Sequence, residues 1–360
     1  MSATIVGIGT AVPRYQILQQ DAAAIARGFA CETAEQERLF AAMFRRSGVE
    51  ARGSVVLTAP EGELAARQSF YGPANPTTAR RMERYEAEAG RMAAESAGRA
   101  IADARIEADR VTHLVTVSCT GFVAPGVDQF LMRAMGLHAD VARTHVGFMG
   151  CHGLVNGLRV AQAFVEADES ASVLLCSVEL CSLHLQYGWN SERMVANALF
   201  ADGAASLVIA RGELPAAASR VCPILALGST TFPRCEDAMS WRICDHGFVM
   251  TLSPRVPEVV GREVRPWLSA WLAGRGYAIE SIGSWAVHPG GPRILSAVGE
   301  ALGLESSALW ASSRVLAEHG NMSSATIAFV LERLRAADAP GPWVAMAFGP
   351  GLAVEVALLG

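Results

Sequence analysis

Short, uniformly apolar segments alternate with helical patterns along this chain, and the alternation restricts the folds that it can adopt. The segments HLVTVSC (113–119) and SVLLCSVEL (172–180) show no polar alternation. Between them, Leu154, Leu158 and Val165 recur at helical spacing. Strands that are apolar on both faces are typical of sheets covered by helices on both sides. The sequence therefore predicts an α/β fold.

The second half of the chain repeats this order coarsely. A strand near 281–287 and two helical segments precede a pair of apolar runs separated by a glycine-rich turn. The segments ALFADGAASLVIA and AMAFGPGLAVEVALL, one from each half, both have the pattern of an apolar hairpin. This internal repeat predicts two similar lobes, 1–210 and 222–360, with a linker at 211–221.

Composition excludes several classes of protein. The chain has 360 residues with 51% hydrophobic content, which is enough for a large core, and its net charge of -5 gives no basic footprint for nucleic acid. The start has no basic region followed by a long apolar run, so no signal peptide is expected. The apolar C-terminal segment is interrupted by Gly349-Pro350-Gly351 and contains Glu355, so we expect a buried hairpin and no membrane insertion.

The eight cysteines form no C-x-x-C pair and no zinc-finger spacing with histidine. Most lie in apolar runs, which favours reduced, buried cysteines in a cytoplasmic protein without a metal. Cys151 differs, because it follows Gly150 and opens a strongly periodic helix. Free N–H groups and the positive end of the helix dipole stabilise a thiolate there, so a lowered pKa is expected. The alternative is a core cysteine at a tight strand–helix junction.

Two further residues occupy similar junctions. His288 follows the strand SIGSWAV, at the edge of the sheet where ligand sites of α/β folds collect. Asn321 in HGNMSSA opens another apolar helix. Each also has a structural interpretation, since His288 could be a turn residue and Asn321 a helix cap. A cysteine hydrolase could use the same three residue types, so these residues alone leave the reaction open.

Six sequence motifs restrict the protein families that this chain can resemble. They are VSCTGFVAPGVD (117–128), GFMGCHGL (147–154), ALFADGAA (198–205), AVHPGGPRIL (286–295), HGNMSSA (319–325) and AFGPGL (347–352). In this order they resemble the chalcone synthase superfamily of type III polyketide synthases. The pair HPGGP and GNMSSA, with the terminal FGPG, distinguishes this family from ketoacyl synthase III and thiolase enzymes.

The resemblance implies a homodimer with the thiolase fold, in which each chain has five layers, α-β-α-β-α, built from two pseudo-symmetric lobes. Cys151 would be the nucleophile that carries the acyl group, with His288 and Asn321 as its catalytic partners. The substrates would be an acyl-CoA starter and malonyl-CoA, with no cofactor besides these thioesters. Asp202 and Glu179 match family positions that we interpret as structural.

The resemblance also implies the walls of a cavity. Phe200 matches one gatekeeper phenylalanine, whereas Met250 stands where the family has the second and would widen the passage. The other cavity positions are Cys119, Thr120, Ala124, Cys181, His184, Trp241, Gly349, Pro350 and Gly351. CoA would be bound by basic residues at the tunnel mouth, for which Arg45, Arg46, Arg52 and Arg293 are candidates. A solvated helix end is the alternative for the arginines near residue 46.

Three cavity positions suggest the starter. Thr120, Ala124 and Cys181 match positions that open a tunnel for long acyl chains in some bacterial relatives, and each buried methylene contributes about 0.8 kcal/mol. Trp241 and His184 would fill the space that a plant-type tetraketide needs. We therefore expect a fatty acyl starter, few extensions, and an alkylpyrone or alkylresorcinol product. The alternatives are an aromatic or short starter, a single-condensation enzyme like ketoacyl synthase III, and an inactive partner subunit.

Overall fold

The computed structural model describes residues 2–211 and 221–360, so the predicted linker at 211–221 falls almost wholly outside the described residues. Within them, nine strands form one sheet in the order β11-β12-β13-β8-β1-β7-β6-β4-β5. In chain order these strands are β1 (Thr4–Ala11), β4 (His113–Ser118), β5 (Ala142–Gly147), β6 (Ser172–Leu180), β7 (Asp202–Ala210), β8 (Cys222–Thr231), β11 (Ser284–Val287), β12 (Trp343–Gly349) and β13 (Ala353–Leu359). Two small hairpin-like pairs lie outside the sheet: β2 (Gln16–Leu18) with β3 (Ala51–Gly53), and β9 (Met239–Cys244) with β10 (Gly247–Leu252).

The two ends of the large sheet have the same topology. In the order β4-β6-β7-β1, the first pair is parallel and the next two pairs are antiparallel. The order β11-β12-β13-β8 has the same parallel and antiparallel pairs. β1 and β8 join the two halves through a short antiparallel contact. The predicted internal repeat is therefore present in the strand topology.

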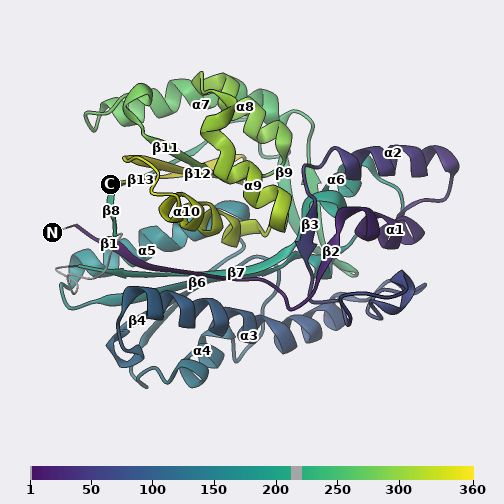
Figure 1. The fold of residues 1–360 in the computed structure, drawn as a ribbon, viewed down its shortest axis with the longest axis horizontal. Helices are drawn as coiled ribbons and strands as arrows, with labels where there is room; N and C mark the ends of the chain where they lie inside the picture. The colour runs from purple at the N-terminus through teal and green to yellow at the C-terminus, as the bar shows by residue number, and fades with distance from the viewer. Residues whose placement is uncertain (1, 212–220) are drawn as a thin grey trace.

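Ten α-helices of the described residues cover the sheet in layers. They are α1 (Gln19–Ala30), α2 (Ala34–Arg45), α3 (Thr78–Ala104), α4 (Val127–Met135), α5 (Gly153–Ala167), α6 (Ser191–Leu199), α7 (Val256–Ala273), α8 (Pro292–Leu302), α9 (Trp310–His319) and α10 (Thr326–Ala336). Figure 1 shows α7 and α8 above β11–β13, α5 and α10 between the two half-sheets, and α3 and α4 below β6 and β7. This is the five-layered α-β-α-β-α arrangement of the thiolase fold.

Three apolar cores hold the layers together. Leu154 and Leu158 of α5 and Phe329 and Val330 of α10 all belong to the middle core, between the half-sheets. The outer cores lie between α7, α8 and β11–β13 on one side and between α3, α4 and β6 on the other. Because α5 and α10 are covered by a sheet on each side, their N-terminal ends are held inside the molecule.

One expected hairpin is wrong. Ala198 and Leu199 complete helix α6, and Asp202 begins β7, so ALFADGAASLVIA contains a helix end and one strand. The Asp202 carboxylate is fully buried and accepts hydrogen bonds from the Val55 N–H at 2.7 Å and the Ser182 N–H at 2.6 Å. Asp202 is therefore a buried bracing residue and does not form the Asp-Gly turn that the pattern suggested.

The expected C-terminal hairpin is confirmed. β12 and β13 pair antiparallel from Trp343–Leu359 to Gly349–Ala353, around the turn that contains Pro350. Both strands are almost entirely buried, which accounts for the apolar character of the segment. Across residues 2–211 and 221–360, no helix combines the length and the apolar character required to cross a membrane.

The contact between β1 and α3 gives a test of the packing. A Cβ on Gly9 would lie 2.3 Å from the Ser96 carbonyl oxygen and 2.4 Å from the Ala100 nitrogen, both of them backbone atoms of α3. We expect Gly9→Ala to lower the free energy of unfolding by about 3 kcal/mol, because the helix must move away from the strand. Denaturant titration measures this change.

The matched control is Gly28→Ala in α1, where the added Cβ would meet no described atom within 4 Å. It should raise stability by about 0.5–1 kcal/mol, because alanine is the better helix former. Equal effects of the two substitutions would contradict the close packing of α3 on β1.

Candidate active site

Cys151 lies in a sharp turn between β5 and α5. The turn spans Gly150–His152 and leads directly into α5, and Cys151 is 6% exposed. Gly150 has a φ of 72°, and a Cβ there would lie 2.4 Å from Pro350. A side chain at this position would both strain the backbone and push Pro350 away. Gly150 thus lets the turn present the sulfur beside the glycine-proline turn of β12 and β13.

Asn321 reaches Cys151 from the other half of the chain. Its backbone N–H donates to the Leu199 carbonyl and its carbonyl accepts from Ala201, both at 2.9 Å, which places Asn321 beside Phe200. Its Oδ1 accepts the Ser323 N–H at 2.8 Å. The side chains of Ser323 and Asn321 lie close enough to the Cys151 sulfur to oppose, in part, the rise that burial causes in the pKa of the thiol. The structure therefore brings Cys151 and Asn321 together as expected.

His288 directly follows β11 and is 1% exposed. Its backbone N–H donates to the Met346 carbonyl at 2.8 Å, but neither ring nitrogen has a hydrogen-bond partner among the described residues. Burial, with a smaller contribution from the neighbouring His152, lowers the pKa of His288 to about 3. A neutral buried imidazole with two unpaired nitrogens is uncommon, and it marks a place where a ligand supplies the missing partner.

The expected thiolate is not stabilised in the unliganded site. The pKa of Cys151 is raised to about 12, mainly because burial disfavours the anion; the charge of Glu179 adds to the rise, and the side chains of Ser323 and Asn321 oppose it only in part. The expectation of a lowered pKa is wrong because the turn holds the sulfur away from water, where an anion is costly. At neutral pH the thiol and the imidazole of His288 are both uncharged.

The buried carboxylate of Glu179 connects two segments of the site by hydrogen bonds. Glu179 at the end of β6 is 0% exposed and accepts from the Cys119 N–H at 3.0 Å, from the Thr120 hydroxyl at 2.7 Å and from the Ser324 hydroxyl. Burial raises the pKa of Glu179. These bonds tie the loop after β4 to the turn Ser323–Ala325, so Glu179 has the structural role that the resemblance implied.

Ser323 is a site residue whose role the sequence analysis did not assign. Its hydroxyl lies 3.1 Å from the Cys119 sulfur, and its side chain also favours the thiolate form of Cys151. It has a φ of 49°, a left-handed conformation that is rare outside glycine. Its position directly after Asn321 and Met322 was the available signal, but a serine near a helix start is more simply explained as a cap.

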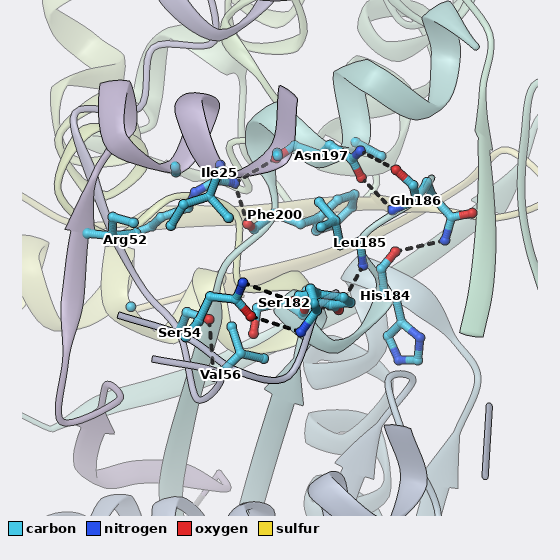
Figure 2. A pocket seen from close by; sticks show the side chains of 18 of the residues that line it. Ile25, Arg52, Ser54, Val56, Ser182, His184, Leu185, Gln186, Asn197 and Phe200 are labelled. Carbon is cyan, nitrogen blue, oxygen red and sulfur yellow. Dashed lines mark hydrogen bonds between the residues drawn. The ribbon is translucent and has the colours of Figure 1, made fainter. Parts of the chain in front are cut away.

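A largely apolar cavity begins next to Phe200 and extends to helix α1 (Figure 2). Five of the predicted cavity residues line it: Phe200, Met250, Cys181, His184 and Trp241. The remaining lining comes mainly from α1, from the segment after β3, and from α6. Phe200, which lines this cavity, pairs through its backbone with Asn321, whereas Cys151, His288 and Asn321 are not among the lining residues.

Two cavity residues are locked by hydrogen bonds. His184 Nδ1 accepts the Phe248 N–H at 2.9 Å, so Nε2 carries the proton and donates to the Thr120 carbonyl at 2.7 Å. Burial lowers the pKa of His184 to about 3, which keeps it neutral. Trp241 Nε1 donates to the Cys119 carbonyl at 2.6 Å. These bonds fix two rings in the space that the sequence analysis expected them to fill.

Other predicted wall residues lie elsewhere. Thr120 is buried, but its hydroxyl is used by Glu179, and Ala124 is exposed in a separate cleft with Phe122 and His145. A tunnel that runs past both Thr120 and Ala124 is therefore not seen in the described residues. Cys119 contributes its carbonyl to Trp241 and its sulfur to Ser323.

The glycine-proline turn packs against the turn of the reactive cysteine. Pro350 contacts Gly150, and a Cβ on Gly349 would lie 2.2 Å from the ring of His152. Gly351 has a φ of 112°, which is a conformation that requires glycine. The three residues Gly349, Pro350 and Gly351 thus shape the wall beside Cys151.

The predicted CoA-binding arginines divide into two groups. Arg46 and Arg293 are exposed and line one groove formed by α2, α6 and the start of α8, and Arg45 is exposed at the end of α2. Arg52 does not fit a phosphate ligand, because it is 7% exposed and its Nη1 donates to the carbonyls of Asn197 and Phe200, each at 2.8 Å. Arg52 instead fixes the backbone around Phe200.

The high pKa of Cys151 predicts how the thiol responds to pH. Because the thiolate fraction grows tenfold per unit below the pKa, alkylation of Cys151 by iodoacetamide should accelerate about tenfold per unit between pH 7 and 10. Peptide mapping by mass spectrometry follows Cys151 separately, with the exposed Cys244 as an internal reference. An alkylation rate at Cys151 that is already level at pH 7 would contradict the effect of burial.

Comparison with known proteins agrees with this geometry. The family model for the N-terminal domain of chalcone and stilbene synthases matches residues 1–213, and the model for the C-terminal domain matches residues 225–360. A 1,3,6,8-tetrahydroxynaphthalene synthase of Streptomyces peucetius subsp. caesius is 34% identical over 99% of this chain and 92% of its own. An alpha-pyrone synthesis polyketide synthase-like protein of Mycobacterium tuberculosis is 30% identical over 98% of this chain and 90% of its own.

Solved structures show the same relationship. The polyketide synthase PKS-I of the brown alga Ectocarpus siliculosus matches with a TM-score of 0.91 and 28% identity, over 99% of this chain and 98% of the other. A fungal type III polyketide synthase matches with a TM-score of 0.87 and 27% identity, over 100% of this chain and 99% of the other. The chain therefore belongs to the chalcone and stilbene synthase family, whose type III polyketide synthases are acyltransferases.

Proposed function

We propose that this enzyme condenses malonyl-CoA repeatedly onto a medium- or long-chain fatty acyl starter that is held as a thioester on Cys151. The unpaired imidazole of His288 is the observation that carries the proposal, because it is buried, interacts with His152 directly after Cys151, and has two nitrogens without partners among the described residues. A bound thioester would supply those partners. The two lobes predicted from the sequence, 1–210 and 222–360, would place Cys151 on one lobe and His288 and Asn321 on the other.

Acyl transfer is the first step. When an acyl-CoA binds, the Cys151 proton moves to His288, and the thiolate attacks the thioester carbonyl while CoA leaves with the proton from His288. The resting site holds both groups neutral, since burial raises the pKa of Cys151 to about 12 and lowers that of His288 to about 3. At neutral pH the thiolate is thus a minor species until a substrate binds, which limits side reactions with oxidants.

In the extension step, His288 and Asn321 stabilise an enolate and Cys151 holds the acyl chain. Malonyl-CoA loses CO2, and the enolate oxygen that forms accepts hydrogen bonds from His288 and from the Asn321 amide. The enolate carbon then attacks the acyl carbonyl on Cys151 and releases the thiolate, so the chain grows by two carbons. After a few cycles the chain cyclises to an alkylpyrone or alkylresorcinol. CoA thioesters supply all of this chemistry, and no further cofactor is proposed.

The groove that Arg46 and Arg293 line is the proposed entrance for CoA. It passes between α2 and the start of α8, and the guanidinium groups face the solvent, where they can pair with phosphates. The functional unit is proposed to be a cytoplasmic homodimer that does not insert into membranes. A single-condensation enzyme like ketoacyl synthase III is the alternative, as is a polyketide synthase with an aromatic or short starter.

Product analysis tests this proposal. Purified enzyme with malonyl-CoA and a panel of acyl-CoA starters should release alkylpyrones or alkylresorcinols extended by several two-carbon units, as mass spectrometry detects. A single β-keto product from every starter would favour the ketoacyl synthase alternative. Products from aromatic or short starters only would reject the fatty acyl part of the proposal.

The role of Asn321 has a separate test. Asn321→Leu removes one donor to the enolate oxygen and should slow decarboxylation of malonyl-CoA by about 100-fold or more. Release of CO2 from labelled malonyl-CoA measures this step without a starter. Cys244→Ala, a substitution of an exposed cysteine in β9, is the control and should leave decarboxylation unchanged. Unchanged CO2 release by Asn321→Leu would contradict the proposed role of the amide.

A further inference from the structure

We infer that His152 supplies, through His288, the proton that each extension cycle consumes, and that this proton enters from the solvent along a polar stripe on α5. The inference rests on the proposed function. His152 directly follows Cys151 and is 3% exposed, yet acyl transfer and extension as proposed leave its imidazole unused. Histidine is the side chain that most often transfers protons in enzymes, so a buried histidine at a reactive turn has the residue type for this task.

Extension consumes a proton, whereas acyl transfer does not. In acyl transfer the proton of the Cys151 thiol leaves with CoA, so no proton enters the site from outside. In extension the bond between the carboxylate and the methylene carbon of malonyl-CoA breaks, CO2 leaves, and the new C–C bond releases Cys151 as a thiolate. That thiolate then attacks the lengthened acyl-CoA, and the departing CoA sulfur takes up one proton. Each further cycle therefore needs one proton from the solvent.

The His152 ring is held in one orientation and one tautomer. Its Nδ1 lies 2.6 Å from Asn156 Oδ1, and because an amide oxygen only accepts, Nδ1 carries the hydrogen and Nε2 the free electron pair. A Cβ on Gly349 would lie 2.2 Å from Cδ2 and 2.6 Å from Nε2 of this ring. The glycine in β12 thus leaves the space that the ring occupies, and Nε2 is the atom that takes up a proton.

His152 and His288 adjoin the same strand. The His288 N–H donates to the Met346 carbonyl of β12 at 2.8 Å, and Gly349, further along β12, lies against the His152 ring. The two imidazoles also interact, because the charged form of His152 disfavours a charge on His288. Neither nitrogen of the His288 ring has a partner among the described residues, so its unprotonated nitrogen is free to accept the proton that His152 holds.

Three polar residues, His152, Asn156 and Arg159, form the polar stripe on α5. His152 is the N-cap of this helix, and the spacing of the other two places all three on one face. Exposure increases along the stripe, since His152 is buried, Asn156 is half-buried and the Arg159 side chain is 43% exposed. The polar stripe therefore leads from the turn of the reactive cysteine to the solvent.

Glu355 of β13 places a negative charge beside the polar stripe. Its side chain is 6% exposed, and its Oε2 lies 2.6 Å from Arg159 Nη2. Burial lowers the pKa of His152, whereas the hydrogen bond to Asn156 and the charge of Glu355 oppose this fall. The resting imidazole is therefore neutral at pH 7. A thiolate on Cys151 adds a second negative charge, which favours proton uptake by His152 at the point where the cycle needs it.

Rapid measurement of CO2 release by the full-length enzyme tests the inference. The enzyme is acylated with a starter that it extends, freed of excess acyl-CoA and mixed with carboxyl-labelled malonyl-CoA. Decarboxylation and the first C–C bond need no proton from outside, but every later cycle does. His152→Gln, which keeps a hydrogen-bonding side chain, should release about one equivalent of CO2 per site at the wild-type rate and then continue about 100-fold more slowly than the wild type.

Two further variants complete the comparison. Glu355→Gln removes the negative charge that favours a protonated His152, and should show the same first equivalent followed by a rate about tenfold below that of the wild type. Gln162→Ala lies on α5 beyond Arg159, where the Gln162 amide bonds to Glu166, and it is the matched control that should behave as the wild type in both phases.

The first equivalent separates proton supply from mere support of the fold. If His152→Gln slows the first equivalent of CO2 as much as the later ones, His152 only shapes the site, and the inference is overturned. Unchanged continuous turnover of His152→Gln also overturns it, because the proton then enters by another route. In both cases the proposed function stands. A wild-type enzyme that extends no starter rejects the proposed function, and the inference with it.

Discussion

The structure depends on the middle core that α5 and α10 share between the two half-sheets. The first turns of both helices are almost entirely buried, and the core that contains Leu154, Leu158, Phe329 and Val330 holds them in fixed positions. Each helix begins with a short turn, Gly150–His152 before α5 and Ser323–Ala325 before α10. Because the helices are fixed, these turns meet, and residues more than 130 positions apart in the chain surround one sulfur atom.

The burial of Cys151 and His288 has two consequences for their chemistry. It removes the thiol and the imidazole from water, so both stay neutral, as the directions of the pKa shifts of Cys151 and His288 show. The same burial makes any charge that develops there interact strongly with nearby dipoles, since the local dielectric constant is low. In the proposed mechanism, the neutral groups of the empty site react once a substrate places its thioester carbonyl beside His288 and Asn321.

Much of the architecture could be predicted from the sequence, because uniformly apolar strands and periodic helices carry a strong local signal. The five layers, the C-terminal hairpin and the meeting of Cys151 with Asn321 all follow from motifs and their order. The segment ALFADGAASLVIA was wrongly predicted to be a hairpin, because an Asp-Gly pair is common in turns, whereas here the Asp202 carboxylate is buried and accepts hydrogen bonds from Val55 and Ser182. Helix α7 was missed as well, and its internal Pro266 explains why.

The site was harder to predict where the answer depends on tertiary burial. Arg52 has the residue type of a phosphate ligand, but its place among backbone carbonyls appears only in three dimensions. The pKa of Cys151 is the same kind of case, since a helix N-terminus and a dry environment act in opposite directions and only the structure shows which one dominates. The positions of Thr120 and Ala124 likewise depend on a loop whose path no local pattern encodes.

The central claim is that Cys151 carries the acyl chain, and mass spectrometry of the acylated protein tests it most directly. Incubation with a fatty acyl-CoA, without malonyl-CoA, followed by acid quenching and peptide mapping, should show the mass of one acyl group on the peptide that contains Cys151. The account predicts that Cys151→Ala acquires no acyl group while it remains folded. Acylation of another residue, or an unmodified Cys151 peptide during turnover, would contradict it.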